Sequence, residues 1–393
     1  MIDDRSAFYA ERDRRTLQYG ADLAVLERPV AVHLGEDAVT TRAGQVMILA
    51  LINMLARMYR RLVLIIPDGP LVARSLVNTS DLATACVSTA KAIDPFIDLD
   101  LNPRRRSSMP GVGIGLAVTT GLDYYLGADR FGATLATDPV KIANSHSTVF
   151  GGGLAACLGA AALFRVGHGH RATPRSLSLW DFSEGDQSSL GPKEVEPVNV
   201  GDVLVVGAGA VSSALCYWLA EVGVTGRWVV ADGDLTELHN LNRTIGLVAA
   251  DAGWPDTTPA NKAVVAARMF DAEPFPGWYH EWLETHSNGR PDLVLPLAND
   301  YGVRHAIGQR GANLVLHATT SNNWTAELHR HIGGRDDCID CRIPQEVQAR
   351  FACSMGPAQP GTKASSDAAL PFLSGAAGAS SGRRTRPAAA RHP

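Results

Sequence analysis

Val203-Leu204-Val205-Val206-Gly207-Ala208-Gly209-Ala210-Val211-Ser212 is the stretch that decides the fold class of this chain. Its first four residues are apolar and mostly β-branched, which is typical of a buried strand. After the two glycines, residues 214–222 are apolar at helical spacing, and a second apolar run at residues 228–231 ends at Asp232. Strand, glycine turn, helix, strand and acid form the βαβ unit that opens a nucleotide- or dinucleotide-binding sheet.

The first half of the chain has a similar sequence of apolar runs that end at a glycine or at an acid. An apolar run at residues 30–35 reaches a glycine, a long apolar stretch covers residues 45–58, and residues 62–66 form a second run. That second run ends at Asp68-Gly69, much as the later one ends at Asp232-Gly233. We interpret this as an internal duplication, because self-similarity at a fixed period marks repeated units. The alternative is that the two halves are unrelated and share this pattern of apolar runs only because both are α/β units.

The predicted fold class is α/β, with two tandem Rossmann-like domains whose mostly parallel sheets are flanked by helices. Later apolar runs at residues 293–295 and 314–316 are expected to add parallel strands to the second sheet. Gly, Pro and Ser are frequent between the halves, and the last residues are basic and of low complexity. The predicted boundaries are a first domain at 1–167, a linker at 168–198, a second domain at 199–379 and a disordered tail at 380–393.

The composition excludes several classes of protein. With 46% hydrophobic and 19% charged residues, the chain has enough apolar material for real cores, which excludes a disordered or coiled-coil protein. A net charge of −4 does not give the excess of positive charge that is typical of nucleic-acid-binding proteins. The charged N-terminus lacks the apolar core of a secretory signal. Apolar stretches at 43–56 and 149–164 fall short of the ~20 residues that a membrane span needs, so we expect a soluble, cytoplasmic protein without a membrane partner.

Polar residues follow the glycine turn in an order that suits a nucleoside triphosphate. They are Asp232, Asp234, Asn240, Arg243 and Lys262. The acid at the end of the second strand can bind ribose hydroxyls, while Arg and Lys neutralise phosphates and Asn donates to them. A hydride-transfer site has no use for this Asn, Arg and Lys. Ser212 also replaces the third glycine of the dinucleotide fingerprint, which weakens the dinucleotide interpretation.

Together these residues resemble the signature of the ubiquitin-activating superfamily, which includes ThiF-type activators of sulfur-carrier proteins. The resemblance covers residue 199 to about residue 378. The matching positions are Gly207, Gly209, Asp232, Asp234, Asn240, Arg243 and Lys262. The resemblance implies an adenylyltransferase that uses ATP and Mg²⁺. Its substrate would be the C-terminal carboxylate of a ubiquitin-like or sulfur-carrier protein, or a short peptide, and thioester formation could follow.

A further acid of the family signature holds Mg²⁺ at the end of a later strand. In this chain the order of the two residues at that place is reversed, to Asn299-Asp300. We expect Asp300 to be the Mg²⁺ ligand, because a carboxylate suits this ion better than an amide. The alternative is that Asp300 caps the helix that follows.

Two kinds of cysteine site are suggested by the same resemblance. Cys338-Ile339-Asp340-Cys341 stands where the family has the first half of a zinc site, although the chain has no second CxxC to complete four ligands. A redox pair is the alternative for this motif. Cys353 stands where several relatives carry a cysteine nucleophile, and the alternatives are a buried apolar residue or a third zinc ligand. Three other cysteines lie in apolar stretches and are expected in the core: Cys86, Cys157 and Cys216.

The first half is interpreted as an inactive partner fused to an active domain, which makes a pseudo-dimer within one chain. Gly35-Glu36-Asp37-Ala38 puts acids where the glycine turn would be, and no Asn-x-x-Arg follows Asp68. Residues 144–165, with a Gly- and Ala-rich core at residues 150–157, resemble the family helix that packs domain against domain. Arg14 matches an arginine that reaches into the partner's ATP site, and a solvated charge run is the alternative. A homodimer of the whole chain is a second arrangement consistent with the family.

Two other functions compete with adenylation. An NAD- or FAD-dependent oxidoreductase would use the same Gly207 to Gly209 turn and Asp232, but would leave the downstream Asn, Arg and Lys without a role. A non-catalytic scaffold would require both halves to have lost their chemistry, whereas the second half keeps a full set of phosphate-binding residues.

Overall fold

The computed structural model describes residues 4–335 with short gaps, together with Ile339. The gaps are residues 19–21, 104–108, 119–120, 144–147, 186–188, 287–288, 311, 321–325 and 334. The described residues form two mixed sheets covered by helices, which confirms the predicted α/β class.

The second sheet is the mostly parallel α/β sheet that the glycine turn predicts. Its strand order is β10-β9-β8-β11-β12-β13, with β13 antiparallel to β12 and the other pairs parallel. The strands are β8 (Val198–Val206), β9 (Val224–Ala231), β10 (Glu273–Phe275), β11 (Leu293–Pro296), β12 (Leu314–Thr320) and β13 (Ala326–Ile332). Strands β8 and β11 are neighbours at its centre, where the strand order reverses. Ligands bind such sheets at the carboxyl ends of the strands near this point.

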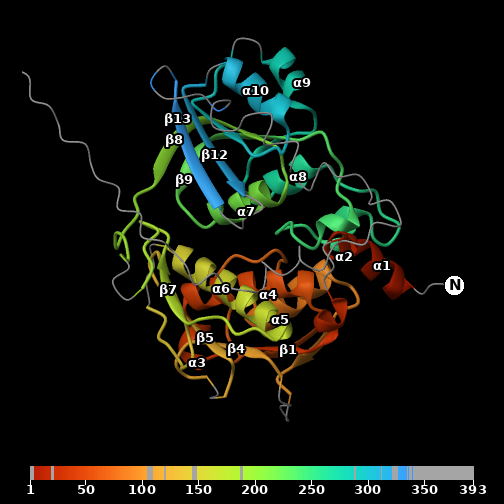
Figure 1. Cartoon of the computed structure of the whole chain (residues 1–393), viewed down its shortest axis with the longest axis vertical. Coiled ribbons are helices and arrows are strands. Elements are labelled where there is room, and N and C mark those ends of the chain that lie inside the picture. The colour runs from red at the N-terminus through yellow and green to blue at the C-terminus, as the bar shows by residue number, and fades with distance from the viewer. Residues whose placement is uncertain are drawn as a thin grey trace, which may run out of the picture. The chain divides into compact units, whose positions relative to one another are not determined.

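Helices cover both faces of the second sheet (Figure 1). Helices α7 (Ala210–Leu219) and α8 (Lys262–Ala267) pack on one face against alternate strand residues such as Val203 and Val205. Helices α9 (Tyr279–Thr285) and α10 (Tyr301–Arg310) pack on the other face, against Leu204 and Val206. Since successive strand side chains point to opposite faces, the apolar run at 203–206 serves both cores at once.

The first sheet repeats this topology. Its order is β3-β2-β1-β4-β5-β6-β7, so its first six strands have the same order as the strands of the second sheet, and β6 is again the antiparallel one. The strands are β1 (Val30–Leu34), β2 (Arg61–Ile65), β3 (Asp98–Leu101), β4 (Gly111–Ile114), β5 (Tyr124–Asp129), β6 (Gly132–Ala136) and β7 (Arg175–Ser178). This shared order is what two copies of one unit would have.

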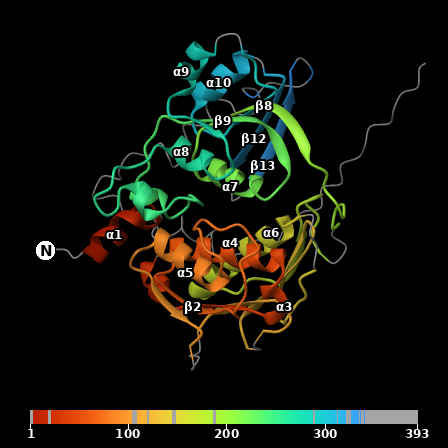
Figure 2. The ribbon, with the colours of Figure 1, turned by 180° about the vertical axis from the view of Figure 1, so that it is seen from behind.

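Helices α4 (Arg42–Met58), α5 (Leu82–Ile93) and α6 (Phe150–Gly167) pack on one face of the first sheet (Figure 2). The side chain of Thr41 accepts a hydrogen bond from the Gly44 amide and so caps α4, whose residues are almost all buried. Among the described helices, α6 is long and apolar enough by length and composition to cross a membrane, but half of it is buried inside the protein. It packs against α4, β5 and β6 as a core helix would.

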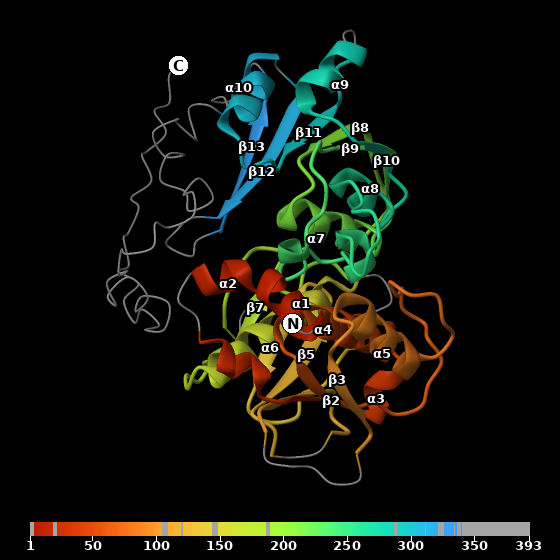
Figure 3. The ribbon, with the colours of Figure 1, turned by 90° about the vertical axis from the view of Figure 1, so that its right-hand side faces the viewer.

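Shorter elements complete the described chain. They are α1 (Asp4–Arg12) and α2 (Arg14–Gln18), drawn in red in Figure 3, α3 (Glu36–Val39), and the 3₁₀ turns η1 (Leu23–Glu27), η2 (Leu238–Asn240) and η3 (Ala249–Ala252). Aromatic residues of α1 pack across to the second half: Phe8 and Tyr9 share a buried cluster with Leu241 and Leu247.

Two sequence expectations need correction. The predicted linker at 168–198 includes β7, which pairs with β6 and so belongs to the first sheet. A short run with little periodicity, Arg175–Ser178, gave no strand signal, because an edge strand is stabilised by its pairing rather than by its own apolar pattern. Cys86 and Cys216 are buried as expected, whereas Cys157 is exposed.

Helix α6 contacts the second half directly, as the Gly- and Ala-rich sequence suggested. A Cβ on Gly153 would overlap the indole ring of Trp218 on α7. Beside this contact, Arg42 Nη2 lies 2.5 Å from Glu221 Oε2, a carboxylate that is only 5% exposed at its side chain. The missing side chain of Gly153 therefore makes room for a close approach between the two α/β units.

Candidate nucleotide-binding site

Gly207 and Gly209 lie in different surroundings, so the lack of a side chain has a different effect at each position. Gly207 has φ +93°, and a Cβ there would lie 2.6 Å from the Ala298 nitrogen, so a side chain is excluded twice. Gly209 has an ordinary extended conformation just before α7, and a Cβ there would meet nothing within 4 Å. The absence of a side chain at Gly209 thus leaves open space before the N-terminus of α7, where backbone N–H groups and the helix dipole favour an anion.

Asp232, at the end of β9, ties the glycine turn to the acidic loop. Its Oδ2 accepts a hydrogen bond of 2.6 Å from the Ala208 amide, and its Oδ1 accepts one of 2.8 Å from the Asp234 amide. A charged acceptor makes these bonds strong. The carboxylate therefore fixes the two loops that border the open space before α7.

Lys262 is placed by the start of α8. Asn261 caps this helix, accepting a hydrogen bond from the Ala263 amide, while its Nδ2 donates to the main-chain oxygens of Asp232 and Asp234. Lys262 Nζ lies 2.6 Å from Asp234 Oδ2. Asp234 thus holds the ammonium group beside the glycine turn.

A pocket lies between these elements. The residues that line it are Ala208, Gly209, Ala210, Ser213, Thr236, Asn240, Arg243, Thr244, Leu247, Lys262 and Val265. Four positions expected from the sequence are among them, namely Gly209, Asn240, Arg243 and Lys262. The structure therefore brings these four residues together around one pocket, which also includes the first residue of α7.

Three hydroxyl residues of this lining were missed by the sequence analysis: Ser213, Thr236 and Thr244. Ser213 is in the first turn of α7, and its position directly after the Gly-x-Gly-x-x-Ser run was a usable signal. Thr236 Oγ1 donates to the main-chain oxygens of Ala260 and Asp251 and so closes the loop after Asp234. No sequence signal marks Thr236 or Thr244, because their places in the pocket depend on long-range contacts.

Hydrogen bonds within residues 237–243 stabilise the segment that carries Asn240 and Arg243. Asn240 Oδ1 accepts a hydrogen bond from the Glu237 amide in a capping box, and its side chain is buried. Arg243 Nη1 donates to the His239 main-chain oxygen at 2.7 Å and to Asn242 Oδ1 at 3.0 Å. These contacts set the direction of both side chains before any ligand arrives.

Arg14 reaches the same segment from the first half, although it is not among the residues that line the pocket. Its Nη2 lies 3.0 Å from His239 Nδ1, and its Nη1 lies 3.1 Å from Glu11 Oε1. Burial lowers the pKa of His239, a shift opposed by Glu237 and reinforced by the positive charges of Arg243, Arg14 and Arg15. A neutral His239 can accept a hydrogen bond from Arg14.

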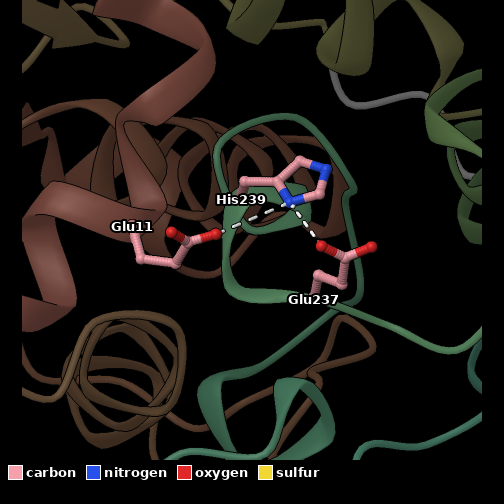
Figure 4. A group of neighbouring side chains, drawn as sticks. All are labelled: Glu11, Glu237 and His239. Atoms are coloured by element: carbon pink, nitrogen blue, oxygen red, sulfur yellow. Dashed lines mark ion pairs between the residues drawn. The ribbon is translucent and has the colours of Figure 1, made fainter. Parts of the chain in front are cut away.

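Glu11, Glu237 and His239 converge closely enough to hold a metal ion by distance alone (Figure 4). Glu237 Oε2 lies 3.1 Å from His239 Nδ1, and Glu11 Oε1 lies 3.9 Å from it. The Arg14 guanidinium is already the cation of this group, since it contacts all three side chains. We assign the group to an ion-pair cluster between α1, α2 and η2 rather than to a metal.

The remaining expected residues lie apart from the pocket lining or outside the described chain. Asp300 is exposed, and its Oδ1 accepts a hydrogen bond of 2.8 Å from the Val303 amide, which is the helix-capping contact named as its alternative role. Cys338, Cys341 and Cys353 lie outside the described residues.

The corresponding turn of the first sheet is filled by an acid. Asp37, in α3 just after β1, accepts hydrogen bonds from the amides of Leu116 and Ala117 at 2.8 and 2.9 Å. A Cβ on Gly35 would lie 2.5 Å from Asp37 Oδ1, so the carboxylate sits directly on the turn. This turn already carries its own negative charge, which opposes binding of phosphate there.

Comparison with known families agrees with this division of the chain. The model of the ThiF family matches residues 183–350. These residues form a ThiF-family domain. The match falls on the part of the chain for which the sequence motifs predicted it. Residues 29–180 match a different model, the BilD N-terminal domain, so the first sheet and the ThiF domain are recognised separately.

Curated relatives resemble different shares of the chain. An uncharacterised protein of Sinorhizobium fredii, y4jF, is 28% identical over 360 residues, which is 86% of this chain and 65% of that protein. A sulfur carrier protein adenylyltransferase of Thermus thermophilus is 27% identical, over 40% of this chain and 60% of its own. The adenylyltransferase and sulfurtransferase MOCS3 of Arabidopsis thaliana is 28% identical, over 43% of this chain and 35% of its own. The chain thus spans less than two thirds of the length of these relatives.

Solved structures of E. coli MccB are similar to part of this chain. MccB with MccA-N7isoASN is 19% identical over 35% of this chain and 42% of its own, with a TM-score of 0.29. The complex with ATP is 16% identical over 39% of this chain and 50% of its own, with a TM-score of 0.31. At TM-scores this low, the likeness adds nothing to the assignment.

Proposed function

We propose that the ThiF domain adenylates the C-terminal carboxylate of a ubiquitin-like or sulfur-carrier protein with ATP. One carboxylate oxygen attacks the α-phosphorus, the bond to the bridging oxygen breaks, and the products are an acyl-adenylate and pyrophosphate. Both reactants are anions, so catalysis depends on positioning and on charge neutralisation. The names of two relatives, a sulfur carrier protein adenylyltransferase and an adenylyltransferase and sulfurtransferase, support this reaction class.

The observation that carries the proposal is the meeting of Asn240, Arg243 and Lys262 at the open N-terminus of α7. An anionic chain of phosphates fits this arrangement, because the space left by Gly209 adjoins two cationic side chains and an amide. Asp232 is placed to accept from ribose hydroxyls, since a carboxylate oxygen keeps acceptor capacity after one hydrogen bond. In an NAD- or FAD-linked dehydrogenase, the positive side chains of Arg243 and Lys262 would have no functional role.

Metal ions enter the proposal at two places. Asp300 would hold Mg²⁺, because this ion prefers carboxylate ligands. The ion would neutralise part of the negative charge of the phosphates. Cys338 and Cys341 would supply two thiolates to a structural Zn²⁺.

The first half and Cys353 are assigned supporting roles. We assign the first half to an inactive partner that completes a pseudo-dimer, with Arg14 directed toward the nucleotide site of the same chain through His239. After adenylation, the thiolate of Cys353 would attack the acyl carbon, forming a thioester and releasing AMP. Cys353→Ser should then keep ATP–pyrophosphate exchange and lose the thiol-sensitive adduct with the carrier, because a hydroxyl is a far weaker nucleophile at neutral pH.

The experiment that tests the proposal is calorimetry with ATP, NAD⁺ and FAD on the full chain. ATP should bind, and Lys262→Ala and Arg243→Ala should each weaken it about tenfold or more, because a charge-assisted contact contributes about 1.5–3 kcal/mol. Arg227→Ala is the matched control, since Arg227 pairs with Glu273 on the surface, with 60% of its side chain exposed. ATP affinity equal in all four proteins, or binding of NAD⁺ or FAD alone, would reject the proposed site.

A further inference from the structure

Three histidines share one face of the β12–β13 pair, away from the nucleotide pocket. His317 on β12 is directly paired with His329 on β13, and His331 lies two residues beyond His329. Residues two apart on a strand point to the same face, and so do directly paired residues. The strand pairing therefore places all three imidazoles together.

The three rings lie close together, but their ring nitrogens are not all within 4.8 Å of one another, so binding of one metal ion would require rotation of the rings. Ring centroids are 4.8 Å apart for His317 and His329, and 5.2 Å apart for His317 and His331. Zn–N bonds of about 2.0–2.1 Å with tetrahedral angles put imidazole centroids about 5 Å apart. His329 and His331 are 6.4 Å apart, so binding would turn the least buried ring, His329, toward His317.

His317 is buried without a partner for its polar atoms. It is 1% exposed, and neither Nδ1 nor Nε2 has a hydrogen-bond partner among the residues that the structure describes. Burying a polar group without a hydrogen bond is costly, which is why buried imidazoles normally have a partner. A metal ion bound to one ring nitrogen would supply that partner.

We propose that His317, His329 and His331 form a binding site for a divalent transition-metal ion, most favourably Zn²⁺. Neutral imidazole is the ligand form, and the arrangement of two histidines on one strand and a third on its neighbour offers three nitrogen ligands. The bound ion would join β13, an edge strand of the ThiF sheet, to its neighbour β12. This site is separate from the CxxC motif, which starts at Cys338.

Neighbouring charges act on this site in opposite directions. Burial, and then the neighbouring His331, His329 and Arg304, lower the pKa of His317 to about 4, so its ring is neutral and able to bind a metal at pH 7. Glu327 Oε2 lies 3.1 Å from His329 Nε2, and a carboxylate partner of this kind orients a ligating histidine and raises its basicity. The positive charge of Arg304 opposes a cation, so Arg304→Gln should tighten metal binding.

The test measures metal binding by the full chain rather than activity. The protein is stripped with a chelator, checked by circular dichroism, and titrated with Zn²⁺ against a chromophoric chelator and with Co²⁺. The starting variant carries Cys338→Ser, Cys341→Ser and Cys353→Ser, which removes any thiolate site. It should still bind Zn²⁺ tightly, and His329→Ala and His331→Ala should each weaken binding about tenfold or more.

His280→Ala is the matched control, because His280 is an exposed histidine on α9, a helix that packs on the same sheet. It should leave Zn²⁺ affinity unchanged. The proposal is overturned if the folded triple-serine variant binds no Zn²⁺, or if its affinity is the same with and without His329 and His331. Should that variant fail to fold, the number of Co²⁺ ions bound by the wild-type chain decides: His329→Ala should bind one ion fewer, and an unchanged number would also reject the site.

Discussion

Arg57 Nη1 donates a hydrogen bond of 2.9 Å to the main-chain oxygen of Leu241, which lies 184 residues further along the chain. Arg57 is 3% exposed, and its Nε donates to Asn53 Oδ1 on the same helix. Burial lowers the pKa of Arg57 to about 9, so the side chain keeps its charge at neutral pH. The bond joins α4 of the first half to the segment that carries Asn240 and Arg243. The first half therefore holds part of the pocket of the ThiF domain in place.

Arg57→Met should lower the free energy of unfolding by about 1.5–3 kcal/mol, because a buried charge-assisted hydrogen bond is lost and the Leu241 oxygen is left without it. ATP affinity should fall with it. Urea denaturation and calorimetry measure the two effects. Arg61→Met is the control, since Arg61 and its partner Asp98 are more than half exposed and such pairs contribute about 0–1 kcal/mol. Equal losses in both variants would contradict a special role for Arg57.

Gly209→Ala should fold normally yet bind ATP poorly. The backbone conformation at Gly209 suits any residue, and a new Cβ would enter open space beside the pocket. Gly207→Ala should instead destabilise the fold by about 1–3 kcal/mol, because its positive φ and the nearby Ala298 exclude a side chain. Thermal melts with and without ATP separate the two outcomes. Wild-type ATP affinity in Gly209→Ala would show that phosphates do not approach this turn.

Gly153→Ala should weaken the packing of α6 on α7. The added methyl group would overlap the Trp218 ring, and overpacking of this kind costs about 1–3 kcal/mol. Trp218→Ala combined with Gly153→Ala should recover part of that loss, giving a coupling energy of about 0.5 kcal/mol or more in a double-mutant cycle. Additive effects in urea denaturation would mean that the two residues do not meet.

Acidification should destabilise the contact between Arg14 and His239. The pKa of His239 is lowered in the folded protein, so the unfolded chain binds more protons as the pH falls through about 6.5. The stability that comes from a neutral His239 is present above that pH and is lost below it. Urea midpoints between about pH 7.5 and about pH 5.5 should fall less in His239→Asn than in the wild type. Parallel curves would reject this assignment.

The sequence by itself determined the α/β class of the chain and predicted the residues of the proposed nucleotide site. Gly209, Asn240, Arg243 and Lys262 line one pocket. The sequence could single them out because each follows a strand or a turn near one βαβ unit, so local order brings them together. The same local logic predicted both sheets. It failed at β7, where pairing with β6 and not an apolar pattern makes the strand.

Only the tertiary structure decided which distant residues meet. Arg57 reaches Leu241, Gly153 admits Trp218, and Arg14 reaches His239 because two α/β units pack on each other, and no periodicity within either unit encodes those pairs. The group of His317, His329 and His331 likewise depends on the register of β12 against β13, since a slip of one residue would turn His317 to the other face. Long-range register and packing are properties of the whole fold, which is why a single sequence read locally does not contain them.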